Sequence, residues 1–128
     1  MPVFRGQCHC GAVQFEIHNQ ERLAGIRRCD CSLCRKKGAV TGTARIDDLI
    51  IVEGADKLSL YQWNTRTARH FFCSICGIYT HHQRRVAPDE FGFNLACIES
   101  VDPALFASAP MTDGRSLSLV EDAEPLKR

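Results

Sequence analysis

The sequence lacks the features that would attach the chain to a membrane or direct it out of the cell. It has no apolar run of the ~18 residues that a membrane-spanning helix requires, and Met1 to Gly6 contain no apolar segment of a signal peptide. It also lacks a dominant charge, since 16 Lys and Arg residues face 15 Asp and Glu residues. We therefore expect a cytoplasmic protein that binds neither membranes nor nucleic acids.

Internal repeats, low-complexity tracts and long linkers are absent as well. Proline and glycine are scattered as turn residues and do not gather at a domain boundary. This pattern predicts a single domain over residues 1–122. The chain becomes polar and acidic after Pro110, and we expect residues 123–128 to form a frayed tail.

Helical patterns are scarce, whereas short apolar segments bounded by turn residues are common. Short helical turns are expected at residues 32–37 and 102–106. The strand candidates are residues 12–17, 39–46, 49–53, 58–63, 69–72, 78–82 and 91–98. In the first candidate, Val13, Phe15 and Ile17 alternate with small or polar residues and should face the core. The sequence predicts a mainly β fold with minimal helix.

Cysteine is abundant for a chain of this kind, with eight residues among 128. Glutathione and thioredoxin keep cytoplasmic thiols reduced, so a disulfide framework is not expected there. Clustered thiols in such a protein indicate a metal site. The cysteines form three groups and a singleton: Cys8 and Cys10; Cys29, Cys31 and Cys34; Cys73 and Cys76; and Cys97.

Two of these groups contain two cysteines each and together supply the four ligands of a structural zinc ion. In extended chain, residues i and i+2 project to the same side, so Cys8 and Cys10 can bind one ion. Cys73 and Cys76 have the C-x-x-C-G spacing of a zinc knuckle, in which Gly77 allows the tight turn. We expect Cys8, Cys10, Cys73 and Cys76 to hold a structural zinc that ties distant parts of the chain together.

The third group has three thiols at C-x-C-x-x-C spacing. Three protein ligands with a vacant fourth position are typical of a catalytic zinc, so we expect Cys29, Cys31 and Cys34 to hold a second ion. Cys97 leaves an alternative open. If it is the fourth ligand, both centres are closed and chemistry at the metal is not expected; its apolar surroundings favour a small buried side chain instead.

Basic residues surround the three-cysteine group. Arg27, Arg28, Arg35, Lys36 and Lys37 would lower the pKa of neighbouring thiols and offset the charge of three thiolates, although a solvated surface run remains the alternative.

The five histidines identify no general base. An exposed or hydrogen-bonded side chain is the simplest interpretation of His18 and His70. His9, His81 or His82 could transfer protons. Because successive strand residues point to opposite faces, at most one of His81 and His82 should point inward.

Three segments carry a resemblance to a known family: Gly6 to Val13, Cys29 to Arg35 and Arg69 to Thr80. With Phe93 to Ile98 and Thr112 to Arg115, they make the chain resemble the glutathione-dependent formaldehyde-activating enzymes and the related centromere-protein-V-like proteins. One departure is Asp30, where family members often carry His. Another is that the chain is shorter than the founding enzyme.

The resemblance implies a β-tent fold of small antiparallel sheets with two zinc ions, at the two sites described above. It also implies a carbon-sulfur lyase that joins glutathione and formaldehyde into S-hydroxymethylglutathione. Our leading hypothesis is therefore a zinc-dependent carbon-sulfur lyase-type enzyme acting on a small thiol adduct, with glutathione as an expected partner. The alternative is a non-enzymatic, zinc-stabilised protein-binding module.

Overall fold

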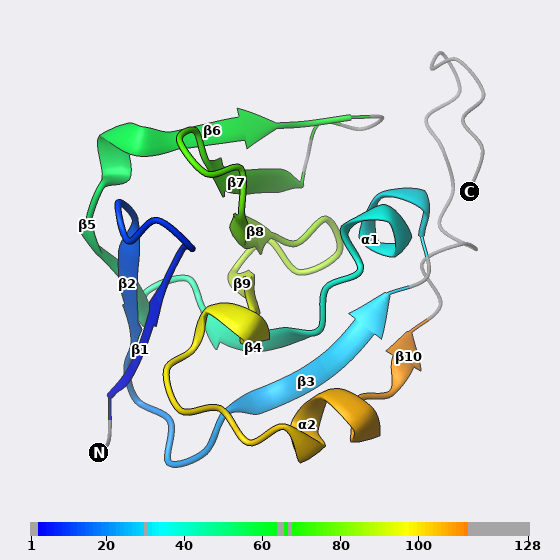
Figure 1. The fold of residues 1–128 in the computed structure, drawn as a ribbon. Coiled ribbons are helices and arrows are strands. Elements are labelled where there is room, and N and C mark those ends of the chain that lie inside the picture. Colours follow the sequence, from blue (N-terminus) through cyan, green and yellow to red (C-terminus); the bar gives the residue numbers. More distant parts are fainter. Residues whose placement is uncertain (1–2, 30, 64–65, 67, 113–128) are drawn as a thin grey trace.

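A computed structural model of the chain describes residues 3–29, 31–63, 66 and 68–112 and contains mostly strands (Figure 1). The strands are β1 (Phe4–Gln7), β2 (Gln14–Ile17), β3 (Ala24–Cys29), β4 (Thr41–Arg45), β5 (Leu49–Glu53), β6 (Leu58–Tyr61), β7 (Arg69–Cys73), β8 (Tyr79–Gln83), β9 (Glu90–Asn94) and β10 (Met111–Thr112). The helices are α1 (Ser32–Lys37) and α2 (Ala104–Ser108), with short 3-10 turns η1 (Ala55–Lys57) and η2 (Leu95–Cys97). The predicted mainly β fold with minimal helix is confirmed.

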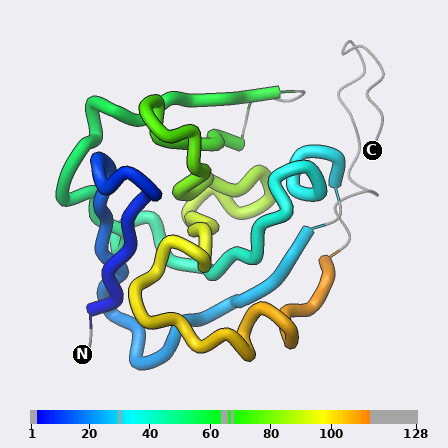
Figure 2. The backbone as a smooth tube through the Cα atoms, in the orientation of Figure 1, coloured from blue at the N-terminus to red at the C-terminus, as the bar shows by residue number. Residues whose placement is uncertain are grey.

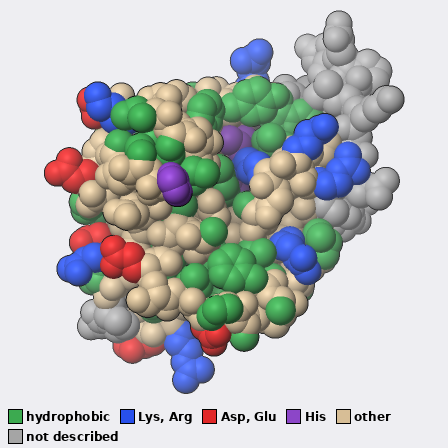
Figure 3. Space-filling view, in the orientation of Figure 1, with side chains coloured by type: hydrophobic (Ala, Val, Ile, Leu, Met, Phe, Trp, Pro, Cys, Tyr) green, Lys and Arg blue, Asp and Glu red, His purple; other side chains and the backbone are tan. Residues whose placement is uncertain are grey.

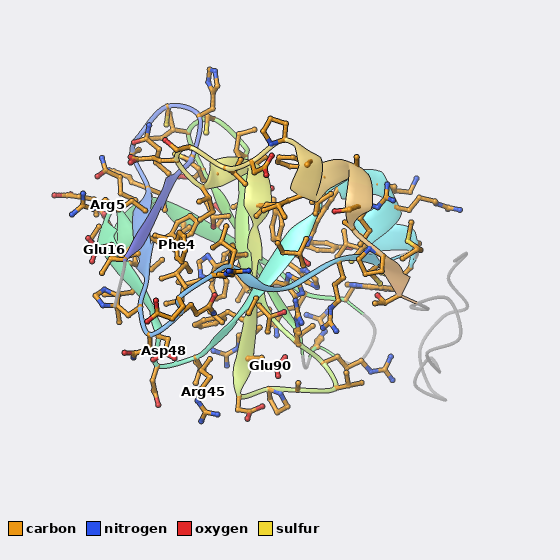
Figure 4. The ribbon with its side chains drawn as sticks, turned by 90° about the horizontal axis from the view of Figure 1, so that it is seen from below. Phe4, Arg5, Glu16, Arg45, Asp48 and Glu90 are labelled. Carbon is orange, nitrogen blue, oxygen red and sulfur yellow. The ribbon has the colours of Figure 1, made fainter. Side chains whose placement is uncertain are left out.

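The smaller sheet has the strand order β1-β2-β5, and both of its strand pairs are antiparallel. Alternation along β2 buries Phe15 and Ile17, as the period-two pattern predicts. Phe4 also turns toward the core, while Arg5 and Glu16 lie side by side on the outer face with 3.5 Å between Arg5 Nε and Glu16 Oε2 (Figure 4). This sheet forms one side of the molecule.

The larger sheet has seven strands in the order β10-β3-β4-β9-β8-β7-β6. It curves from β6 and β7 at the top of Figure 1 to β3 and β10 at the bottom. Its pairs are antiparallel except β10 with β3, which run parallel. The family resemblance implies small antiparallel sheets. The structure instead has one sheet of seven strands, and one short pair in it is parallel.

Two groups of buried side chains join the sheets. The main core packs Phe15 and Ile17 of β2 against Phe93 of β9 and Leu95 of η2. A smaller core contains Val13 with Cys8 and Cys73, each at most 1% exposed. The second group brings the β1–β2 turn against the end of β7.

The chain after β9 returns to the smaller sheet (Figure 2). The Glu99 N–H donates to the Arg5 carbonyl at 2.8 Å, and Gly6 forms an isolated bridge with Ile98. Predicted strand 91–98 is therefore wrong in its second half: β9 ends at Asn94, whose side chain accepts a hydrogen bond from the Ala96 N–H and caps η2. Strands β1, β3 and β10 lie outside the predicted segments.

Within the described residues, no helix has the length and apolar character needed to cross a lipid bilayer. The expected tail at residues 123–128 falls outside the described part of the chain.

Candidate metal centre

Four cysteines from two distant turns meet at one point. Cys8 and Cys10 lie in the turn between β1 and β2, whereas Cys73 ends β7 and Cys76 lies in the turn before β8. Their four sulfur atoms lie within 4.8 Å of one another. The distance from Cys10 Sγ is 3.6 Å to Cys8 Sγ and 3.7 Å to Cys73 Sγ. Sulfurs bound to one tetrahedral zinc at ~2.3 Å are ~3.8 Å apart, so this cluster fits the ion.

Backbone N–H groups point at these sulfurs, as they do around metal-bound thiolates. The Val13 N–H donates to Cys8 Sγ at 3.3 Å, and the Ile75 N–H donates to Cys73 Sγ at 3.4 Å. Hydrogen bonds from the backbone of Cys10 and of Ile78 lower the pKa of Cys76 to about 6. Backbone donors therefore favour the thiolate form of Cys73 and Cys76, which is the form that binds a metal. The backbone of Ala12 lowers the pKa of Cys10, but burial and hydrogen bonds with the other three thiols raise it to about 11.

A second cluster forms where β3 meets α1. Cys29 ends β3, Cys31 caps α1 and Cys34 lies in its first turn. The Cys34 N–H donates to Cys31 Sγ at 3.4 Å, and the three sulfurs lie within 4.8 Å of one another. Hydrogen bonds with Cys29 and then Cys34 lower the pKa of Cys31, and hydrogen bonds with Cys29 and then Cys31 raise the pKa of Cys34. Three soft donors at this spacing also fit zinc.

The three-cysteine cluster has no fourth ligand among the residues that the structure describes. Asp30, between Cys29 and Cys31, is not one of them. The structure places Cys97 in neither cluster. Its side chain is buried in η2, its thiol points to the Tyr79 carbonyl at 3.7 Å, and burial raises its pKa to about 12. Cys97 thus has the features of a small buried side chain.

A polar cluster that sequence reasoning missed involves Lys37, the last residue of α1. Its Nζ donates to His70 Nδ1 at 2.8 Å and lies 3.7 Å from the centroid of the Tyr79 ring. The Tyr79 hydroxyl is 2.5 Å from His82 Nδ1, and the His82 ring stacks on His70 with centroids 5.1 Å apart. Burial lowers the pKa of Lys37 to about 8 and that of His70 to about 3.

Both histidines at positions 81 and 82 are packed among other rings, so the prediction that at most one points inward is wrong. His81 is 3% exposed and stacks on Phe71, with ring centroids 4.7 Å apart. His82 lies on the opposite face of β8, and burial lowers its pKa well below the usual value. Strand β8 lies inside the seven-stranded sheet, and side chains cover both of its faces there.

The other basic residues near the three-cysteine cluster do not share the surroundings of Lys37. Arg35 and Lys36 are exposed on α1, as a solvated surface run would be. Lys and Arg side chains gather on the side of the molecule where α1 lies (Figure 3). Arg28 instead points inward, and its guanidinium donates to the Ala109 carbonyl at 3.2 Å.

Comparisons with known proteins agree with this arrangement. A curated protein of Halomonas elongata, named "Putative glutathione-dependent formaldehyde-activating enzyme", is 35% identical over 82 residues. The match covers 58% of this chain, which spans about half (52%) of the length of that relative. A Rhodobacter sphaeroides protein of known crystal structure is 54% identical, with a TM-score of 0.78 over 84% of this chain and 99% of that chain.

A family model covers most of the sequence. The model described as "Glutathione-dependent formaldehyde-activating enzyme" matches residues 3–110, which include both cysteine clusters and the segment carrying Lys37, His70 and Tyr79. The chain therefore belongs to the glutathione-dependent formaldehyde-activating enzyme family.

Proposed function

We propose that the protein is a zinc-dependent carbon-sulfur lyase-type enzyme that makes or breaks an adduct between a small thiol and an aldehyde, with glutathione and formaldehyde as substrates. The observation that carries this proposal is the three-cysteine cluster. It fits a metal ion but has no fourth ligand among the described residues. Catalytic zinc sites keep such a position for substrate. Family membership supports the choice of substrates.

The two cysteine clusters would have different roles, one structural and one catalytic. Cys8, Cys10, Cys73 and Cys76 would hold a structural zinc, and Cys29, Cys31 and Cys34 would hold the catalytic one. When bound there, the second zinc would supply a Lewis acid that favours the thiolate form of the substrate. We further propose that the protein works in a reducing compartment such as the cytoplasm, because the clustered cysteines must stay reduced to bind zinc.

The residues of this chain would bind and orient the substrate. Arg35 and Lys36 are exposed beside the three-cysteine cluster and can attract the carboxylates of glutathione. Glutathione carries a net negative charge at neutral pH, so these cations would raise its local concentration. The sulfur atom would then meet the aldehyde carbon next to the cluster, on the side where α1 presents Cys34.

Exchange spectroscopy with 13C-formaldehyde and glutathione tests the proposal. The uncatalysed reaction also forms the adduct, so the quantity to measure is the rate of exchange between free and adduct carbon at equilibrium. We expect zinc-loaded protein to raise this rate in proportion to its concentration, and Cys31→Ser to abolish the increase. Protein with two zinc ions that leaves the rate unchanged would instead favour the non-enzymatic module.

Isothermal titration provides a second, independent measurement. We expect the zinc-loaded protein to bind glutathione, and the oxidised disulfide form, which lacks a free thiol, to bind more weakly. No heat of binding at millimolar glutathione would remove this thiol from the proposal.

A further inference from the structure

Helix α1 connects the three-cysteine cluster to a buried polar cluster on the larger sheet. Cys34 and Lys37 are three residues apart in α1, so their side chains lie on the same side of the helix. Lys37 extends from there onto β7 and β8, where its ammonium meets His70 and Tyr79. Histidine and Lys or Arg side chains are visible next to each other in a recess of the face shown in Figure 3.

The contacts of Lys37 fix the orientation of its ammonium group. An ammonium group has three N–H donors and no acceptor, so His70 Nδ1 must accept the 2.8 Å hydrogen bond. This requires a neutral His70 with its proton on Nε2. The Tyr79 ring contacts the same ammonium by its face, at 3.7 Å from the centroid. His70 uses one N–H of Lys37, and the described contacts show no acceptor for the other two.

Lys37 stays mainly a cation at neutral pH, because burial lowers its pKa only to about 8. Its ammonium contacts His70 and Tyr79, and His82 stacks on His70. Burial holds the pKa of His70 near 3, so that imidazole is neutral at physiological pH. The charges of Cys34, Cys31 and Cys29 also act on Lys37 and oppose the effect of burial on its pKa. Lys37 follows Cys34 by about one turn of α1, so its side chain starts beside the cluster.

We propose that Lys37 is a catalytic residue whose ammonium donates a hydrogen bond to the aldehyde oxygen while the carbon-sulfur bond forms. This inference rests on the proposed function. In that step the substrate thiol loses its proton to water, and sulfur adds to the carbonyl carbon. The π electron pair moves to oxygen, which then takes a proton from water. The reverse reaction follows the same path, and no oxidant or reductant is needed.

The ammonium is suited to this role because it is preorganised. A donor that is already fixed does not reorient when negative charge develops on oxygen, and this makes such donors effective in partly buried sites. His70 and Tyr79 are positioning residues in this scheme: His70 accepts one N–H, and the ring of Tyr79 holds the ammonium by its face. The hydrogen bond between Tyr79 and His82 fixes that ring in turn.

Lys37→Met, Lys37→Gln and Lys37→Arg test the inference, with Lys57→Met as the control at an exposed lysine of η1, outside both cysteine clusters. Zinc content, glutathione affinity and exchange kinetics are measured for each. We expect Lys37→Met and Lys37→Gln to keep two zinc ions and the glutathione affinity but to lower kcat about 100-fold, the usual loss for one oxyanion donor. Lys37→Arg should recover part of kcat, and Lys57→Met should have the kcat of the wild type.

The positioning role of His70 has its own readout. His70→Gln keeps an acceptor for the Lys37 N–H and should retain most of kcat, whereas His70→Leu should lower kcat with little change in KM.

Two outcomes separate this inference from the proposed function. If wild-type protein with two zinc ions does not catalyse exchange, the proposed function fails and the inference fails with it. If wild type is active and folded Lys37→Gln keeps its kcat, the inference alone is overturned. Loss of zinc from both Lys37→Gln and Lys37→Arg would overturn it as well, because Lys37 would then stabilise the cluster and not the reacting oxygen.

Discussion

At the level of single residues, the two cysteine clusters differ in burial. The four-cysteine cluster has two buried members, Cys8 and Cys73, beside the exposed Cys10 and the partly exposed Cys76. The three-cysteine cluster has no buried member, since Cys29, Cys31 and Cys34 are all partly exposed. Buried thiols that hold a zinc ion also form part of the core, so their replacement removes both packing and metal binding. We therefore expect Cys73 to stabilise the fold and Cys31 to serve the accessible metal site.

Substitution of one cysteine from each cluster should separate these roles. We expect Cys73→Ser to abolish soluble folded protein, because it forfeits much of a metal contribution of ~10 kcal/mol or more. Cys31→Ser should leave a folded protein with one zinc ion. Soluble yield, zinc content and far-UV circular dichroism provide the measurements. Equal losses from the two substitutions would contradict a division into structural and functional sites.

His81 makes the stability of the fold depend on pH. Burial lowers the pKa of His81 from 6.5 to about 4. The unfolded chain therefore binds more protons at mildly acidic pH, and the stability held at neutral pH is lost as the pH falls from 6.5 toward 4. Between pH 7.5 and 5.5 this histidine should account for about 1 kcal/mol of lost stability.

His81→Phe keeps an aromatic ring against Phe71 and Phe91 but removes the titrating group. Urea unfolding at several pH values is the measurement. The variant should lose less stability than wild type on acidification. Both proteins have the same metal sites, so any release of zinc at low pH should lower their stability equally and cancel in the comparison. Parallel curves for the two proteins would show that His81 does not titrate in this range.

At the level of elements, the sequence predicts best where a periodic pattern and a turn signal coincide. The structure has β5 and α1 at the predicted bounds, since Gly54 follows β5 and Gly38 ends α1 with a φ of 65°. Strand β3 has none of these signals: it contains a glycine and two arginines, and none of its residues is fully buried. Neighbouring strands hold it in place, and a local pattern cannot show this.

The same limit explains which part of the candidate site was predicted. Spacing alone groups the seven clustered cysteines as the structure places them. The contact of Lys37 with His70 spans 33 residues and crosses from α1 to β7. In the sequence Lys37 stands among four other basic residues flanking the cysteines, and nothing local distinguishes it from Lys36. Only the tertiary structure shows that Lys37 packs against the larger sheet while Lys36 stays exposed.

Strands β4 and β9 approach closely at one glycine. Gly42 lies opposite Phe93, which is fully buried, and a Cβ atom at position 42 would collide with the Phe93 ring. We expect Gly42→Ala to lower the free energy of unfolding by about 2 kcal/mol through overpacking. Urea denaturation of the zinc-loaded wild type and variant measures this difference in the free energy of unfolding.

A double-mutant cycle with Phe93→Leu identifies the cause. The smaller side chain leaves space for the added methyl group, so Gly42→Ala should cost less in that background. Additive losses would show that the collision with the ring is not responsible.

At the level of the whole molecule, the four-cysteine cluster joins the two sheets. Cys8 and Cys10 lie between two strands of the smaller sheet, whereas Cys73 ends β7 of the larger sheet and Cys76 lies in the turn before β8. The three-cysteine cluster joins only β3 to α1, which adjoin in the sequence. A metal that closes a long loop restricts the unfolded chain more than one that closes a short loop. Removing metal from the first cluster should therefore affect the fold far more.

Gradual chelation of the zinc-loaded protein should proceed in two phases. The three-cysteine site has one ligand fewer, so its zinc should leave first, with catalysis lost and the circular dichroism spectrum retained. The second zinc should leave more slowly, and the fold should be lost with it, because the β1–β2 and β7–β8 turns are then no longer tied. Zinc release, recorded with a colorimetric indicator alongside circular dichroism, distinguishes the phases. A chain that keeps its fold after both ions are gone would show that the hydrophobic core alone holds the two sheets together.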